Sequence, residues 1–133
     1  MIVADTNLIA YLLIPGEHST AARAVLKKDP AWHAPTLWRT EFVSVLLKHL
    51  KRGDFEVDIA LDLLEAASEL MRTGEHQVRQ SDAMRLALQS GRSAYDCDFV
   101  ALAQDLGLPL VTADSRLAEA FPDCAQPMEA FLE

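Results

Sequence analysis

The sequence has few cysteines, no long apolar run and no excess of positive charge, and each of these absences excludes a class of protein. Two cysteines among 133 residues, Cys97 and Cys124, cannot form a disulfide framework, and neither has a neighbour at zinc-ligand spacing. The longest uninterrupted apolar run, Leu8 to Ile14, is far shorter than a membrane span. No basic region stands at the N-terminus, so no signal peptide is indicated. We therefore expect a cytoplasmic protein with reduced thiols and no membrane association.

The charge balance is acidic, with 12 Lys and Arg against 20 Asp and Glu and a formal net charge of −8. A protein that holds nucleic acid through a broad basic face has the opposite balance. Contact with a polyanion should therefore be local and assisted by cations. Six acids follow one another without an intervening Lys or Arg, and we interpret them as a solvated face or a partner surface: Asp54, Glu56, Asp58, Asp62, Glu65 and Glu69.

The alternation of short apolar strands with helices predicts an α/β fold. Half of the residues are apolar, and the length suits one domain over residues 1–133. The expected strands are 2–4, 31–34, 77–79, 108–112 and a short edge strand near residue 125. The expected helices are 6–13, 21–28, 35–52, 58–71, 83–89, 95–106 and 114–120. Short, continuously apolar strands of this kind indicate a three-layer α/β/α domain with a mostly parallel central sheet.

Three acidic residues stand at positions that a parallel sheet brings to one edge. Asp5 follows the first strand, and Asp114 follows the strand that ends at Thr112. Ligands bind at the carboxyl edge of the strands in open α/β sheets, so these two acids belong where a site is expected. Asp96 lies in the first turn of its helix, and the start of a helix that follows a strand faces the same edge. We therefore expect the three carboxylates to converge.

Glu41 is a fourth acid in an unexpected place. It lies four residues from both Leu37 and Val45, which puts all three residues on one stripe of the helix over 35–52. The same helix has solvated positions for a charge, such as those of Lys48 and Lys51. A charge on a stripe that faces the core is costly unless it is paired or bound to a metal. Glu41 is therefore a candidate member of the same site.

Each acid alone also has an ordinary structural explanation. Asp5 and Asp114 could cap the helices that follow them, Asp96 forms Ser-x-x-Asp with Ser93, and Glu41 could reach solvent from the edge of its stripe. If the four meet, however, they stay ionised together only around a cation. Because no His or Cys flanks them, the donor set favours Mg²⁺ or Mn²⁺, which grips phosphate oxygens and activates water. Hydrolysis of a phosphate ester is the expected chemistry.

These motifs together resemble the PIN-domain ribonucleases. The resemblance rests on Val-Ala-Asp-Thr-Asn at 3–7, Glu41, Tyr-Asp-Cys-Asp-Phe-Val-Ala-Leu-Ala at 95–103, and Leu-Val-Thr-Ala-Asp at 110–114 with Arg116-Leu117 after it. It covers essentially the whole chain and is strongest with the VapC-type toxins of bacterial and archaeal toxin–antitoxin pairs. It implies a compact α/β/α fold and a Mg²⁺- or Mn²⁺-dependent endoribonuclease that cleaves RNA. It also implies a homodimer and a small antitoxin protein whose tail blocks the site.

The resemblance also assigns residues by position. The acidic quartet would be Asp5, Glu41, Asp96 and Asp114. Hydrogen bonds to those acids, or to a metal-bound water, would come from Thr6, Asn7 and Thr112. Asp5, Asp96 and Asp114 would hold one or two cations, and Glu41 would bind the second cation or orient the attacking water. Asp98, two helical positions beyond Asp96, turns away from it, and we expect it to be solvated or at an interface rather than a ligand.

Three arginines flank the acids in sequence and would meet RNA phosphates at the rim: Arg39, Arg92 and Arg116. The apolar stripe of the helix over 35–52 could be plain core or part of a groove for an antitoxin helix, and it comprises Trp38, Phe42, Leu46 and Leu47. Both the toxin and a housekeeping PIN-type RNA-processing nuclease fit these features. A catalytically silent PIN-like binding module is the alternative from a different class.

Two other folds with acids at strand ends fit less well. A haloacid-dehalogenase-type phosphotransfer enzyme needs Asp-x-Asp after the first strand, but position 7 is Asn. A receiver-type signalling module needs a lysine late in the chain at a strand end. The four lysines all lie in the first half of the sequence: Lys27, Lys28, Lys48 and Lys51.

Overall fold

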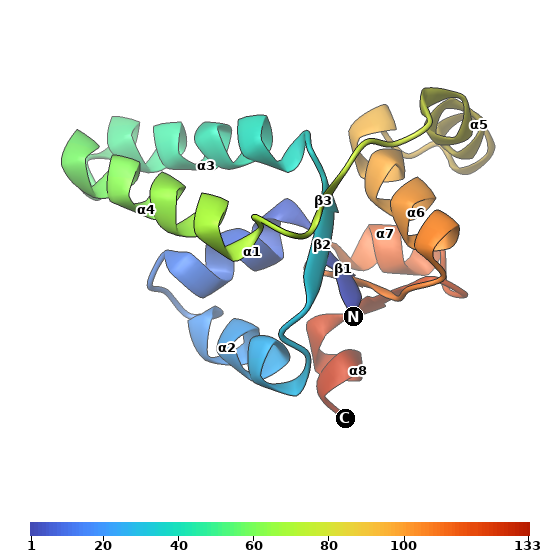
Figure 1. The fold of residues 1–133 in the computed structure, drawn as a ribbon, viewed down its shortest axis with the longest axis horizontal. Helices are drawn as coiled ribbons and strands as arrows, with labels where there is room; N and C mark the ends of the chain where they lie inside the picture. Colours follow the sequence, from blue (N-terminus) through green and yellow to red (C-terminus); the bar gives the residue numbers. More distant parts are fainter.

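Five parallel strands form the centre of the molecule in a computed structural model that describes residues 1–133 (Figure 1). Their order across the sheet is β3-β2-β1-β4-β5, with bounds β1 Ile2–Ala4, β2 Trp32–Pro35, β3 Glu75–His76, β4 Leu110–Thr112 and β5 Ala125–Pro127. The central strand β1 pairs on one side with β2, where Val3 faces His33, and on the other with β4, where Val3 faces Leu110. The sheet is thus entirely parallel.

Helices cover both faces of this sheet. They are α1 Thr6–Leu13, α2 Ser19–Lys28, α3 Trp38–Arg52, α4 Val57–Leu70, α5 Gln80–Ser90, α6 Ala94–Leu106, α7 Ser115–Ala120 and α8 Met128–Leu132. Figure 1 shows α1 to α4 on one side of the sheet and α5 to α7 on the other, with both chain termini near the same end. The expected three-layer α/β/α arrangement is therefore confirmed.

The core lies between the sheet and these two helical layers. All three residues of β1 are fully buried, as Leu110 and Val111 of β4 are, because strands of a parallel sheet are covered on both faces. Trp38 and Phe42 of α3 are fully buried as well, so most of the apolar stripe on this helix is core. Leu47, which was grouped with them by sequence, is 45% exposed.

The structure differs from the sequence predictions mainly at element ends. The helix predicted over 21–28 begins two residues earlier, at Ser19, whose hydroxyl accepts a hydrogen bond from the Gly16 N–H and donates one to the Ile14 carbonyl. The strand predicted over 77–79 lies instead at Glu75–His76. Helix α8 was not predicted. No helix in the structure combines the length and apolar character needed to cross a membrane.

Candidate active site

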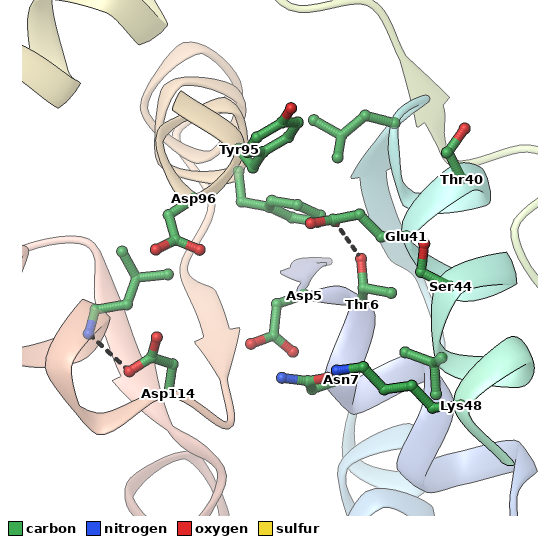
Figure 2. A pocket seen from close by; sticks show the side chains of 14 residues that line it. Asp5, Thr6, Asn7, Thr40, Glu41, Ser44, Lys48, Tyr95, Asp96 and Asp114 are labelled. Carbon is green, nitrogen blue, oxygen red and sulfur yellow. Dashed lines mark hydrogen bonds between the residues drawn. The ribbon is translucent and has the colours of Figure 1, made fainter. Parts of the chain in front are cut away.

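A cavity of about 650 Å³ opens at the carboxyl edge of the sheet, and all four predicted acids line it (Figure 2). Asp5 reaches it from the end of β1, Glu41 from α3, Asp96 from the start of α6 and Asp114 from the turn after β4. Figure 2 shows the carboxylates of Asp5, Asp96 and Asp114 directed toward the same space, with Glu41 on the α3 side. Acidic residues that are more than a hundred positions apart in the sequence therefore face the same cavity.

Asp5 is the most buried of these acids, and its carboxylate is fully hydrogen-bonded. Its Oδ1 accepts from the Leu8 N–H at 2.8 Å and so caps α1, while its Oδ2 accepts from the Thr112 hydroxyl at 2.6 Å and the Ala113 N–H at 3.0 Å. Burial raises the pKa of Asp5, and the charge of Asp114 adds to the rise, whereas the three hydrogen bonds oppose it. Thr112, as the resemblance implied, contacts an acid of the site.

Asp114 and Asp96 meet on a single arginine. Asp114 caps α7 through its Oδ1, which accepts from the backbone N–H groups of Arg116 and Leu117. Its Oδ2 accepts from Arg92 Nη2 at 3.2 Å, and the Asp96 Oδ2 accepts from the same nitrogen at 3.2 Å. Ser93 caps α6 by accepting from the Asp96 N–H, so the Asp96 carboxylate is left free for the cavity and for Arg92.

Glu41 faces the other three acids from α3. It is half-buried, and its Oε1 accepts a hydrogen bond from the Thr6 hydroxyl at 2.7 Å. Burial raises the pKa of Glu41, the Thr6 bond lowers it, and the charges of Asp96, Asp5 and Asp98 raise it further. Leu37 and Val45 line the same cavity, so the stripe that the sequence predicted for this helix does face the site.

Comparison with known proteins assigns the fold to a family. A model of the PIN domain matches residues 2–121. The chain belongs to the PIN-domain family. It is 35% identical over 129 residues to Ribonuclease VapC3 of Pyrobaculum aerophilum, which covers 95% of this chain and 98% of that protein.

Two solved structures share the PIN fold. The crystal structure of PAE2754 from Pyrobaculum aerophilum has a TM-score of 0.78 and 19% identity, over 98% of this chain and 85% of that one. A toxin–antitoxin complex from Klebsiella pneumoniae has a TM-score of 0.71 and 15% identity, over 96% of this chain and 98% of that one. At these identities, the two structures support the fold alone.

Several side chains of this PIN domain lie elsewhere than the sequence suggested. Asp98, expected to be solvated or at an interface, is only 8% exposed, and burial raises its pKa while a hydrogen bond from Gln80 of α5 opposes the rise. It does not line the cavity. Arg39 pairs with Glu75 at 2.7 Å instead of standing free at the rim, whereas Arg116 is exposed.

Lys48 is a lining residue that sequence reasoning missed, because it was assigned to the solvated side of α3. It is exposed but borders the cavity beside Asn7 (Figure 2). Helical spacing could have predicted this position, since Lys48 lies seven positions after Glu41 and therefore on the same helical face. Arg92 was expected to meet phosphates but contacts two acids.

The donor set of the site suits a divalent cation. VapC-type ribonucleases of the PIN family are generally dependent on a divalent metal. Here four carboxylates line one cavity, and the pKa values of Asp5 and Glu41 are raised first by burial and further by neighbouring acids, a repulsion that a hard cation would relieve. No three of the four carboxylates lie close enough to one another in this structure to coordinate one metal ion. Their carboxylates are instead engaged with Arg92, Thr6, Thr112 and backbone N–H groups.

Proposed function

We propose that this PIN domain is a VapC-type toxin, a metal-dependent endoribonuclease that hydrolyses RNA phosphodiester bonds. One observation carries the proposal: a chain that is 35% identical to Ribonuclease VapC3 over nearly its full length brings Asp5, Glu41, Asp96 and Asp114 to one cavity. Four carboxylates with no His or Cys among them suit Mg²⁺ or Mn²⁺. The cavity is open to solvent, since several of its lining residues are exposed, Tyr95 and Lys48 among them.

In this proposal Asp5, Asp96 and Asp114 hold the cation. The bound ion supplies charge for a phosphate oxygen and lowers the pKa of a water molecule. The chain's own contribution is to position these carboxylates. Thr112 and the Ala113 N–H fix one oxygen of Asp5, and helix α7 fixes one oxygen of Asp114. This leaves the orientation of Asp96 as the least constrained of the three.

Glu41 is the proposed general base. A base works best when its pKa lies close to the working pH, and the pKa of Glu41 is raised by burial and by the acids around it. The Thr6 hydroxyl holds one of its oxygens at 2.7 Å and leaves the other for a water. Asn7 lies beside Lys48 at the mouth, where both face an incoming phosphate chain.

The proposed partners are RNA, a small antitoxin protein and a second copy of the chain, in the cytoplasm. Exposed apolar side chains on the α3–α4 hairpin suit an interface, and they are Val43, Leu47, Val57, Ile59 and Leu61. The Klebsiella pneumoniae neighbour is itself a toxin–antitoxin complex. Trp38, Phe42 and Leu46 are buried and belong to the core, so they would not contact the antitoxin directly.

Asp96→Asn is the sharpest test of the active site. The carboxylate of Asp96 has Arg92 as its hydrogen-bonding partner, so its loss should leave the fold intact. RNA cleavage in Mg²⁺ should fall at least about a hundredfold, the size of effect expected for removing a group that acts on the transition state. Asp105→Asn, at an exposed position of the same helix α6, is the matched control and should cleave like the wild type. Full activity of Asp96→Asn would contradict the proposal.

Expression in a bacterial host separates a toxin from a housekeeping RNA-processing nuclease. A toxin should arrest growth, and the Asp96→Asn variant should not. Rescue by a small DNA-binding protein encoded next to this chain would identify the antitoxin. Calorimetry with Mn²⁺ addresses a catalytically silent binding module, which would show no binding that depends on the site acids.

A further inference from the structure

Arg92 bridges two of the acids of the proposed metal site, Asp96 and Asp114. The Oδ2 atoms of Asp96 and Asp114 both contact one nitrogen, Nη2, at 3.2 Å each. Because the two contacts end on the same atom, the two carboxylates converge on a point that the guanidinium fills. The arginine side chain is 25% exposed, against 31% for Asp96 and 34% for Asp114, so water screens the trio only in part.

The loop that carries Arg92 is held at both ends. Gly91 ends α5 in the left-handed conformation with a φ of 73°, and Ser93 caps α6. Between them, the Arg92 N–H donates to the Ser90 hydroxyl at 3.1 Å. The backbone is therefore fixed, and any change of position at Arg92 belongs to its long side chain.

The guanidinium itself is incompletely satisfied in this arrangement. Its Nε is buried and has no hydrogen-bond partner, whereas Nη2 serves both acids. Arginine frequently binds one carboxylate through two parallel N–H donors, and Arg92 does not do so here. Arg92 thus binds both acids through one nitrogen and leaves its buried Nε–H unpaired. This incomplete pairing indicates a contact that a cation with higher affinity for the two carboxylates can replace.

We propose that Arg92 is a built-in counter-cation that competes with the divalent metal for Asp96 and Asp114. A divalent ion held by these two carboxylates would lie close to the guanidinium, and the two cations would repel each other. We therefore expect metal binding to move the Arg92 side chain away from Asp96 and Asp114. The inference rests on the proposed function, because it concerns the metal site, and it makes Arg92 a positioning residue rather than a ligand.

The test is Mn²⁺ calorimetry without RNA on three proteins: the wild type, Arg92→Gln and Arg116→Gln. Arg116 is the matched control because it is an exposed arginine two residues after Asp114 whose side chain forms no ion pair. Arg92→Gln should bind Mn²⁺ about tenfold more tightly than the wild type, since the cation no longer displaces a charge-assisted contact. Arg116→Gln should stay within about twofold of the wild type, because exposed charges are screened.

A second measurement keeps the inference testable should Arg92→Gln fail to fold. In the wild type, saturating Mg²⁺ should shift the NMR signal of the Arg92 Nε–H and leave that of Arg116 in place. An unmoved Arg92 signal, or Mn²⁺ affinities of Arg92→Gln at or below that of Arg116→Gln, would overturn the inference while leaving the nuclease proposal intact. Absence of Mn²⁺ binding in all three proteins would overturn both.

Discussion

At the residue scale, the acids of this site combine structural and chemical duties. Asp5 and Asp114 both line the cavity and each caps a helix with one oxygen. The other oxygen accepts from Thr112 and the Ala113 N–H in Asp5, and from Arg92 in Asp114. Capping and a site role are alternatives when only the sequence is considered, yet a carboxylate has two oxygens and these residues use both. Substitution of either acid therefore disturbs a helix as well as the site. Asp96 and Glu41 cap no helix, which makes them better probes of chemistry.

Thr6→Val tests how Glu41 is held. Valine has nearly the shape of threonine but cannot donate the 2.7 Å hydrogen bond to Glu41. The loss should cost about 1 kcal/mol of stability and should raise the pKa of Glu41 further, because that bond lowers it in the wild type. If Glu41 acts as the ionised base, cleavage needs the pH to exceed its pKa. The acid limb of the pH–rate profile should therefore move to higher pH, which RNA cleavage at a series of pH values measures.

Thr40→Val is the control for this change. Thr40 lines the same cavity on α3, is exposed and forms no side-chain hydrogen bond with Glu41. The acid limb of the pH–rate profile of Thr40→Val should coincide with that of the wild type. An identical profile for Thr6→Val and Thr40→Val would refute the assignment of Glu41 as base.

The positions of these residues were partly readable from the sequence. Parallel strands end at one edge of the sheet, where the following helices begin, and this rule predicted the positions of Asp5, Asp96 and Asp114. Helical spacing predicted the position of Glu41. Asp98 was misplaced because its surroundings come from α5, and the spacing within α6 holds no information about that neighbour. The bridge from Arg92 to two acids likewise depends on packing across 22 positions.

At the element scale, the strongest apolar patterns were predicted correctly and the weakest pattern was not. Strand β1 and helix α6 agree with their predicted ranges to within one residue. Strand β3 lies two residues earlier than Val78 suggested. Its position is set by contacts with its neighbours: Glu75 accepts from the Trp38 indole at 2.7 Å, and the Gly74 carbonyl oxygen accepts from the Ala34 N–H at 2.9 Å. A side-chain pattern alone cannot show these contacts.

Gly74→Ala tests how β3 is held against β2. A Cβ at this position would lie 2.0 Å from the Trp32 carbonyl oxygen, a backbone atom that cannot move without shifting the strand. The substitution should lower the free energy of unfolding by about 2 kcal/mol or more, as overpacking against a fixed neighbour does. Urea unfolding followed by circular dichroism measures the change.

Gly16→Ala provides the comparison for that measurement. Its Cβ would find its nearest atom at 4.0 Å, and its φ is not in the left-handed region. The stability of this variant should stay within about 0.5 kcal/mol of the wild type. Equal stabilities for the two variants would show that the close approach of Gly74 does not hold β3.

At the scale of the whole molecule, negative charge gathers in two places. One is the cavity, and the other is the acidic stretch from Asp54 to Glu69 on and before α4. Exposed apolar side chains accompany the second region, as expected of a surface for a partner. The net charge of −8 favours binding of cations anywhere on the molecule, so a metal effect must be traced to the cavity.

Thermal unfolding with and without Mn²⁺ makes that distinction. A cation that binds only the folded protein stabilises it by about 2.7 kcal/mol at a hundred times its dissociation constant. The wild type and Asp105→Asn should gain this stability and lose it on addition of a chelator. Asp96→Asn, which keeps the acidic stretch but lacks one site carboxylate, should gain far less. An equal gain in Asp96→Asn would place the cation outside the cavity at the end of β1, since that cavity contains Asp96.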